Sequence, residues 1–139
     1  MVYLNCGGPR KYLFDTHALI ALLRGSPRFV GRLRRRVPGD FGIASIALHE
    51  LYYGAYKSAR VEENLARIDS MRIAVLPFDT EDARQAGEIR STLARAGKTI
   101  GPYDSLIAGQ AKARSLTLIT HNVAEFSRVV GLRVEDWEG

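Results

Sequence analysis

Tyr12-Leu13-Phe14-Asp15-Thr16 is the stretch that decides the fold. Its three apolar residues end abruptly at two polar ones, which predicts a short buried strand. The next apolar run, residues 18–23, shows no strand alternation and stops at Gly25, which predicts a helix. A buried strand followed directly by a helix is the beginning of an α/β fold.

The rest of the chain repeats this alternation. Further strands are expected at residues 41–44, 73–76, 116–120 and 132–134. Further helices are expected from Pro27 to the turn at residues 38–40, and at residues 46–56, 61–71, 80–96, 104–114 and 123–126. Ser45 is the expected cap of one helix, and Asp79 or Thr80 that of another. Because no hairpin signal separates the strands, the pattern predicts a parallel sheet with helices on both faces.

Length and composition define the class of protein. The 139 residues correspond to one domain, expected over residues 11–139, with residues 1–10 as an N-terminal extension outside the fold. No apolar run approaches the length of a membrane span, and the N-terminus lacks the apolar region of a signal peptide. The single cysteine, Cys6, excludes an intramolecular disulfide and a zinc site with several thiolates. A cytoplasmic protein is therefore expected.

The charge is basic and comes mainly from arginine. The net charge is +5, and 16 of the 20 cationic side chains are arginines. The planar guanidinium suits phosphate, so the balance is compatible with nucleic acid, although solubility alone also explains it. Arg32, Arg35 and Arg36 lie together on one expected helix and are candidate RNA contacts. Their alternative role is that of a solvated helix face.

Four candidate functional residues lie near strand ends or helix starts, where parallel α/β sheets bind ligands. Asp15 and Asn122 follow expected strands, Asp104 follows a Gly-Pro break, and Glu50 lies one turn into a helix. Asp15, Asp104 and Asn122 have a plain alternative role as helix caps. The alternative role of Glu50 is to form part of a polar helix face together with His49 and Lys57.

Carboxylates clustered without thiolates are typical of a site for Mg²⁺ or Mn²⁺. Such an ion polarises a phosphoryl oxygen and lowers the pKa of a bound water. Other chemistries lack their residues. No glycine-rich phosphate loop follows the first strand, and no Gly-x-Ser-x-Gly elbow exists. A haloacid-dehalogenase-like phosphatase needs a second aspartate at the position of His17.

Four segments together resemble the motifs of the PIN-domain ribonucleases, specifically the VapC-type toxins of toxin–antitoxin pairs. The segments are residues 13–17 (Leu-Phe-Asp-Thr-His), 49–54 (His-Glu-Leu-Tyr-Tyr-Gly), 100–108 (Ile-Gly-Pro-Tyr-Asp-Ser-Leu-Ile-Ala) and 120–126 (Thr-His-Asn-Val-Ala-Glu-Phe). The resemblance covers about residues 11–137. Each motif is weak alone, but four in the right order and spacing are specific.

The resemblance implies an α/β/α sandwich with a parallel sheet of four to five strands. It also implies an Mg²⁺- or Mn²⁺-dependent endoribonuclease that leaves 5′-phosphate and 3′-hydroxyl ends, homodimers, and a cognate antitoxin that blocks the site. By position, Asp15, Glu50 and Asp104 match the three principal acids and metal ligands, and Asn122 matches a fourth, supporting position. The implied substrate is RNA, for example a structured loop such as a tRNA anticodon stem-loop.

His17 departs from the family pattern, which has asparagine there. Its ring is expected beside the carboxylates, which would raise its pKa; the alternative is that it caps the following helix and points away. Together, His17 and Asn122 support a second hypothesis, a PIN-like binding module that acts by binding RNA or an antitoxin with little catalysis.

Overall fold

The structure is a computed structural model that describes residues 10–139. The expected extension, residues 1–10, therefore lies outside the described residues apart from Arg10. The strands are β1 (Tyr12–Phe14), β2 (Phe41–Ala44), β3 (Val75–Leu76), β4 (Thr117–Ile119) and β5 (Val134–Glu135). The helices are α1 (Thr16–Arg24), α2 (Pro27–Arg34), α3 (Ser45–Tyr56), α4 (Val61–Asp69), α5 (Thr80–Arg95), α6 (Pro102–Ala113) and α7 (Val123–Phe126), with a 3-10 turn over Pro38–Asp40. None of these helices is long and apolar enough to span a membrane.

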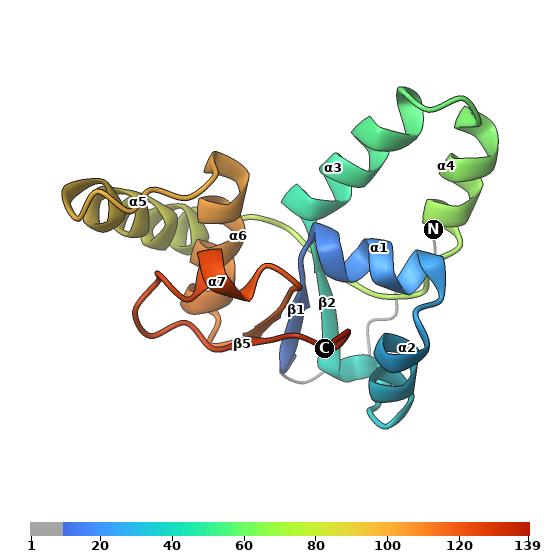
Figure 1. Cartoon of the computed structure of the whole chain (residues 1–139), viewed down its shortest axis with the longest axis horizontal. Helices are drawn as coiled ribbons and strands as arrows, with labels where there is room; N and C mark the ends of the chain where they lie inside the picture. Colours follow the sequence, from blue (N-terminus) through green and yellow to red (C-terminus); the bar gives the residue numbers. More distant parts are fainter. Residues whose placement is uncertain (1–9) are drawn as a thin grey trace.

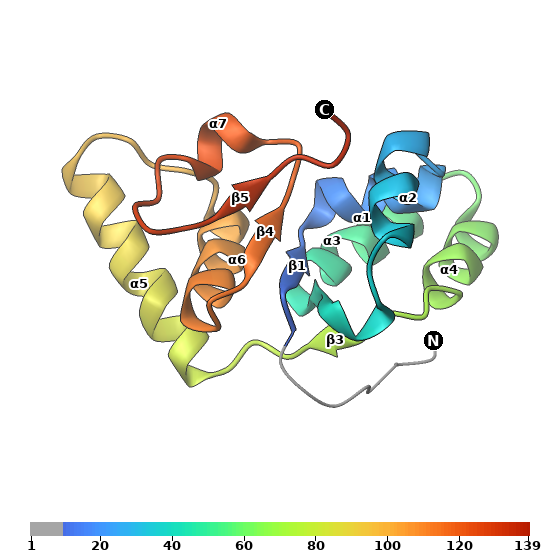
Figure 2. The same ribbon diagram turned by 90° about the horizontal axis from the view of Figure 1, so that it is seen from below.

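All strand pairs are parallel, in the order β3-β2-β1-β4-β5. β1 is the central strand, and Phe14 is paired with Ile43 on one side and Ile119 on the other. Figure 1 shows helices on both sides of the sheet, with α5 and α6 on one side and α1, α2 and α4 on the other. The view in Figure 2 shows the same division. The predicted α/β sandwich with a parallel sheet is confirmed, and the sheet has five strands.

Two local details differ from the sequence prediction. Ser45 is not a cap, because α3 begins at Ser45 itself and extended Ala44 occupies the cap position without a side-chain hydrogen bond. The edge strands β3 and β5 are only two residues long, shorter than expected. Asp79, in contrast, caps α5 and forms a reciprocal capping box with Asp82, so this prediction is confirmed.

The C-terminal segment is part of the core. Trp137 is 1% exposed and its ring packs against those of Phe14 and Phe29. The Arg36 guanidinium lies over the Trp137 ring, 4.5 Å from its centroid, and an Arg32 Nη donates to the Asp136 carbonyl at 2.7 Å. These contacts join α2 to the segment that follows β5.

α5 and α6 pack unusually closely at Gly109. A Cβ atom on Gly109 would lie 2.6 Å from the backbone nitrogen of Ala86. A rigid helix backbone cannot move away as a flexible side chain can, so only glycine permits this crossing. Gly87, on α5, has nothing within 4 Å of the corresponding position.

We expect Gly109→Ala to lower the free energy of unfolding by about 1–3 kcal/mol, because the methyl group must push α5 and α6 apart. The matched control, Gly87→Ala, should raise it by about 0.5–1 kcal/mol, because alanine favours a helix where space is open. Urea unfolding of both variants measures the difference. Equal effects of the two substitutions would show that the close crossing does not limit stability.

Candidate active site

Asp15 is placed at the carboxyl end of the central strand. Its backbone N–H donates to the Ile119 carbonyl at 3.3 Å, which ties it to the end of β4. The side chain is buried, and Oδ1 accepts from the backbone N–H of Ala18 at 2.9 Å. Oδ2 lies 3.5 Å from Nδ1 of His17. Asp15 therefore caps α1 with one oxygen and leaves the other at the edge of the sheet.

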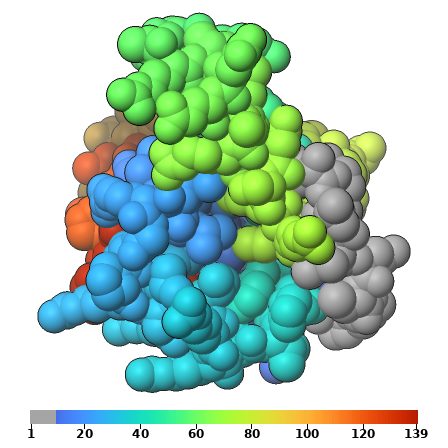
Figure 3. Space-filling view, turned by 90° about the vertical axis from the view of Figure 1, so that its right-hand side faces the viewer, coloured from blue at the N-terminus to red at the C-terminus, as the bar shows by residue number. Residues whose placement is uncertain are grey.

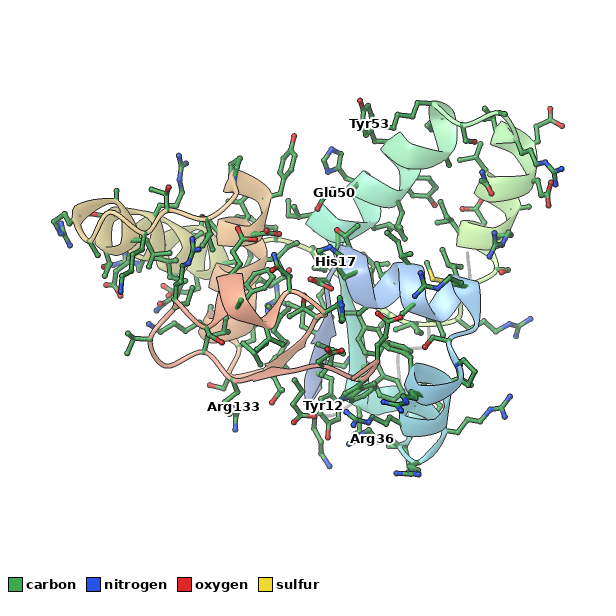
Figure 4. All side chains as sticks on the ribbon, in the orientation of Figure 1. Tyr12, His17, Arg36, Glu50, Tyr53 and Arg133 are labelled. Atoms are coloured by element: carbon green, nitrogen blue, oxygen red, sulfur yellow. The ribbon has the colours of Figure 1, made fainter. Side chains whose placement is uncertain are left out.

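Glu50 is held beside Asp15 by a neighbouring hydroxyl. Thr16 donates from Oγ1 to Oε1 of Glu50 at 2.8 Å. The contact forms because β2 lies next to β1, so α3 and α1 begin side by side at the same edge of the sheet. Figure 4 shows Glu50 and His17 close together there.

Asp104 and Glu125 meet around Gly101. Asp104 is in the first turn of α6 and does not cap it, since Gly101 occupies the cap position. A Cβ on Gly101 would lie 3.4 Å from Oδ2 of Asp104 and 3.8 Å from Oε1 of Glu125. Glu125 accepts from the Gly101 N–H at 2.8 Å and from the side-chain amide of Asn122. Asn122 therefore holds Glu125 in place, and its side chain makes no cap bond to α7.

The charges of the cluster repel one another. Burial and the nearby carboxylates of Glu125, Asp15 and Glu50 raise the pKa of Asp104 to about 6. The pKa of Glu125 is lowered, chiefly by the hydrogen bond from Gly101, so Glu125 keeps its charge. The hydrogen bond with Asp15 raises the pKa of His17, as expected, and the charges of Asp104 and Glu50 add to this effect.

The structure thus brings together Asp15, Glu50, Asp104 and Asn122, the four residues singled out in the sequence. Glu125 is a further member that the sequence analysis missed. Its spacing of three from Asn122 on a short helix was the available signal, because such residues share a helix face. Within residues 10–139, no lysine or arginine forms an ion pair with Asp15, Glu50 or Asp104. His17 beside Asp15 is therefore the one side chain of these described residues that can pair a positive charge with the three carboxylates, and only when its ring is protonated.

Comparison with known proteins identifies the family. Residues 12–132 match the PIN domain family. The chain belongs to this family. It is 43% identical over 129 residues to the tRNA(fMet)-specific endonuclease VapC of Shigella flexneri, a match that covers 91% of this chain and 98% of the relative. The Ribonuclease VapC2 of Haemophilus influenzae is 36% identical with the same coverage.

Two of the solved structures that resemble this chain also come from VapC-containing complexes. The chain resembles the DNA-bound VapBC of Salmonella typhimurium with a TM-score of 0.87 and 41% identity, over 92% of this chain and 98% of the solved one. VapBC-1 of nontypeable Haemophilus influenzae gives a TM-score of 0.83 and 30% identity, over 92% and 98%. Within the PIN domain family, this chain is therefore a VapC protein.

Arg32 and Arg36 of this PIN domain lie away from its acidic cluster, against the C-terminal segment. Figure 4 shows Arg36 at the opposite end of the sheet from Glu50. Arg32 and Arg36 bind the C-terminal segment, and Arg36 also donates to the Arg32 carbonyl at 2.7 Å. Arg35 is exposed. RNA contact by these three residues stays a prediction, and Arg35 has the least intramolecular engagement of them.

The charge repulsion predicts how Asp104→Asn changes PIN domain stability with pH. The pKa of Asp104 is raised from an ordinary 3.8 to about 6 on folding, so its ionisation opposes folding above pH 6. Without divalent ions, the variant should be more stable than the parent at pH 7.5, by about 1 kcal/mol once solvent screening is allowed for. The gain should shrink as the pH falls from 6 to 4, because the parent then binds a proton there. Urea unfolding at several pH values measures it, and a gain that does not change with pH would contradict the assignment.

Proposed function

We propose that this VapC protein is the toxin of a type II toxin–antitoxin pair, a divalent-metal-dependent endoribonuclease that hydrolyses RNA to 5′-phosphate and 3′-hydroxyl ends. The observation that carries the proposal is the convergence of Asp15, Glu50 and Asp104 from three separate elements on one site. The Shigella flexneri relative, named for cleavage of tRNA(fMet), supports a structured RNA such as tRNA as substrate. An RNA substrate of this kind would place its action in the cytoplasm.

The residues present fit a hard cation. The cluster offers carboxylate and amide oxygens, the donors that Mg²⁺ and Mn²⁺ prefer. Within residues 10–139, no three acidic, histidine or cysteine side chains are already grouped closely enough to hold one ion. Mg²⁺ commonly binds through one or two carboxylates and keeps several waters, so it does not require three acidic side chains in direct contact. Asp15 and Asp104 would hold the ion, and Glu50 would bind it directly or through a water.

A bound ion would supply charge stabilisation at the phosphoryl group and activation of water. The chain's own residues set the geometry. Thr16 orients Glu50 through its hydroxyl, and Asn122 and the Gly101 N–H orient Glu125. Glu125 contributes negative charge beside Asp104 and is a positioning residue in this proposal.

A groove of about 610 Å³ supports an antitoxin partner. Its apolar lining includes Leu22, Leu33 and Met71, and arginines such as Arg34 and Arg72 border it. Figure 3 shows the hollow between α1, α2 and the segment that follows α4. An amphipathic acidic segment matches such a surface. The solved relatives are VapBC complexes, which supports an antitoxin partner here. We also propose a homodimer that forms a larger assembly with the antitoxin.

The alternative is a PIN-like module that binds RNA or antitoxin without efficient cleavage. His17 favours it, because an imidazolium paired with Asp15 would compete with a cation for the same oxygen. The two functions differ in one result, which is RNA cleavage that depends on a divalent ion.

We expect the purified protein to cleave RNA with Mg²⁺ or Mn²⁺ and to lose this activity in EDTA. Asp104→Asn should reduce cleavage by at least about 100-fold, because one ligand charge is lost, while the circular dichroism spectrum stays that of the parent. The control, Asp69→Asn, removes an exposed carboxylate on α4 and should cleave at the parent rate. An Asp104→Asn variant as active as the parent would refute the metal site.

His17→Asn should keep activity to lower pH than the parent with saturating Mg²⁺. The pKa of His17 is raised, so the ring binds a proton as the pH falls and then attracts the Asp15 carboxylate away from the cation. The measurement is the pH–rate profile of both proteins. Superimposable profiles would show that His17 does not influence the site.

A further inference from the structure

An exposed aromatic strip borders the acidic cluster. Its members are His49 and Tyr53 on α3 and Tyr103 at the start of α6, all three of them exposed. His49 directly precedes Glu50, and Tyr103 directly precedes Asp104. Two members of the strip are therefore sequence neighbours of two of the carboxylates, and the strip is separate from the acidic cluster itself.

The rings of His49 and Tyr103 connect the two sides of the site. They meet edge to face with their centroids 5.0 Å apart, although one belongs to α3 and the other to α6. His49 is held in orientation by its Nδ1, which donates to the Ile46 carbonyl at 3.1 Å. Because the contact is edge to face, ring faces stay open for stacking.

Tyr53 extends the strip along α3. It follows His49 by four residues, so both lie on the same face of the helix, and its side chain is 62% exposed. The Lys57 ammonium lies 4.7 Å from the centre of its ring. Figure 4 shows Tyr53 farther along α3 than Glu50. Tyr53 thus combines an aromatic ring with an adjacent positive charge.

This surface suits a nucleic-acid strand better than a protein partner. Beside the acidic cluster, basic side chains would pair with the carboxylates and compete with a cation, so a strand there must be held by other means. Aromatic rings bind the faces of unpaired bases without a charge of their own. Lys57, beyond the carboxylates, is placed to attract a phosphate. Tyrosine is also common in protein interfaces, so a contact between two copies of the chain is the competing outcome of the test below.

We propose that His49, Tyr53 and Tyr103 form a base-stacking platform that holds unpaired RNA nucleotides next to the scissile phosphate. The proposal rests on the proposed endoribonuclease function and narrows its substrate to RNA that is single-stranded at the point of cleavage. Every base has a ring face that can stack, so the platform favours RNA with unpaired nucleotides and discriminates little between base sequences.

The test compares base-bearing and abasic RNA. Binding of a short labelled oligouridylate, and of the same strand with central abasic nucleotides, is measured by fluorescence anisotropy in the Asp104→Asn background with EDTA. Tyr103→Ala and Tyr53→Ala should each weaken binding of the base-bearing strand by about 5- to 30-fold. Tyr103→Phe and Tyr53→Phe should restore it, and the abasic strand should bind all of these proteins equally and weakly.

Val37→Ala is the control. Val37 is an exposed apolar residue directly after Arg36, which Figure 4 shows at the opposite end of the sheet from Glu50. The Val37→Ala variant should bind RNA like the parent background. Equal losses for Val37→Ala and Tyr53→Ala would overturn the platform, as would losses that are the same for the base-bearing and abasic strands.

The experiments also separate a failure of the stacking proposal from a failure of the endoribonuclease proposal. If the alanine variants change the molar mass in light scattering and leave RNA binding unchanged, the strip is a contact between two copies of the chain, and the proposal is wrong. If the parent never cleaves RNA with Mg²⁺ or Mn²⁺, the endoribonuclease proposal fails. The binding comparison in EDTA still decides whether the rings stack on bases, because it does not depend on cleavage.

Discussion

The position of β1 in the middle of the sheet is the constraint on which the rest of the molecule depends. Its residues are hydrogen-bonded to β2 on one side and β4 on the other, so its register is determined twice. A shift by one residue would turn Leu13 and Phe14, which are fully buried, towards the wrong faces. The same register places Asp15 at the carboxyl edge. Core packing therefore positions the central carboxylate of the site.

The acidic cluster is held against its own repulsion. Asp15 caps α1, Asp104 lies in the first turn of α6 and Glu50 lies one turn into α3, and the packing of these helices on the sheet brings their charges together. Burial, together with the nearby carboxylates, raises the pKa of Asp104. Hydrogen bonds from Gly101 and Asn122 stabilise the charge on Glu125. In the proposed metal site, a bound cation would offset this repulsion and would raise the stability of the PIN domain.

The carboxyl end of the sheet carries the acidic cluster, and the side chains near the other end stabilise the fold. At the carboxyl end lie the cluster and the exposed rings of His49 and Tyr103. Towards the other end, Arg36 covers Trp137, and Arg32 binds the Asp136 carbonyl. Arg36 is adjacent in sequence to exposed Arg35 and Arg32 lies three residues before it, yet Arg32 and Arg36 stabilise the fold. A cluster of basic residues in a sequence thus combines structural and surface roles that charge alone does not separate.

The sequence by itself determined the order and type of the elements, because buried apolar runs, Gly and Pro breaks and the cap at Asp79 are local signals. It also indicated Asp15, Glu50, Asp104 and Asn122, since polar residues at strand ends meet at one edge of a parallel sheet. Only the tertiary structure decided that Glu125 joins them, that Arg32 and Arg36 face the C-terminal segment, and that His49 touches Tyr103. The hydrogen bond between Gly101 and Glu125 joins residues 24 positions apart in the sequence, and the one between Arg32 and Asp136 joins residues 104 positions apart. Long-range contacts depend on how the helices pack on the sheet, and no local pattern encodes that packing.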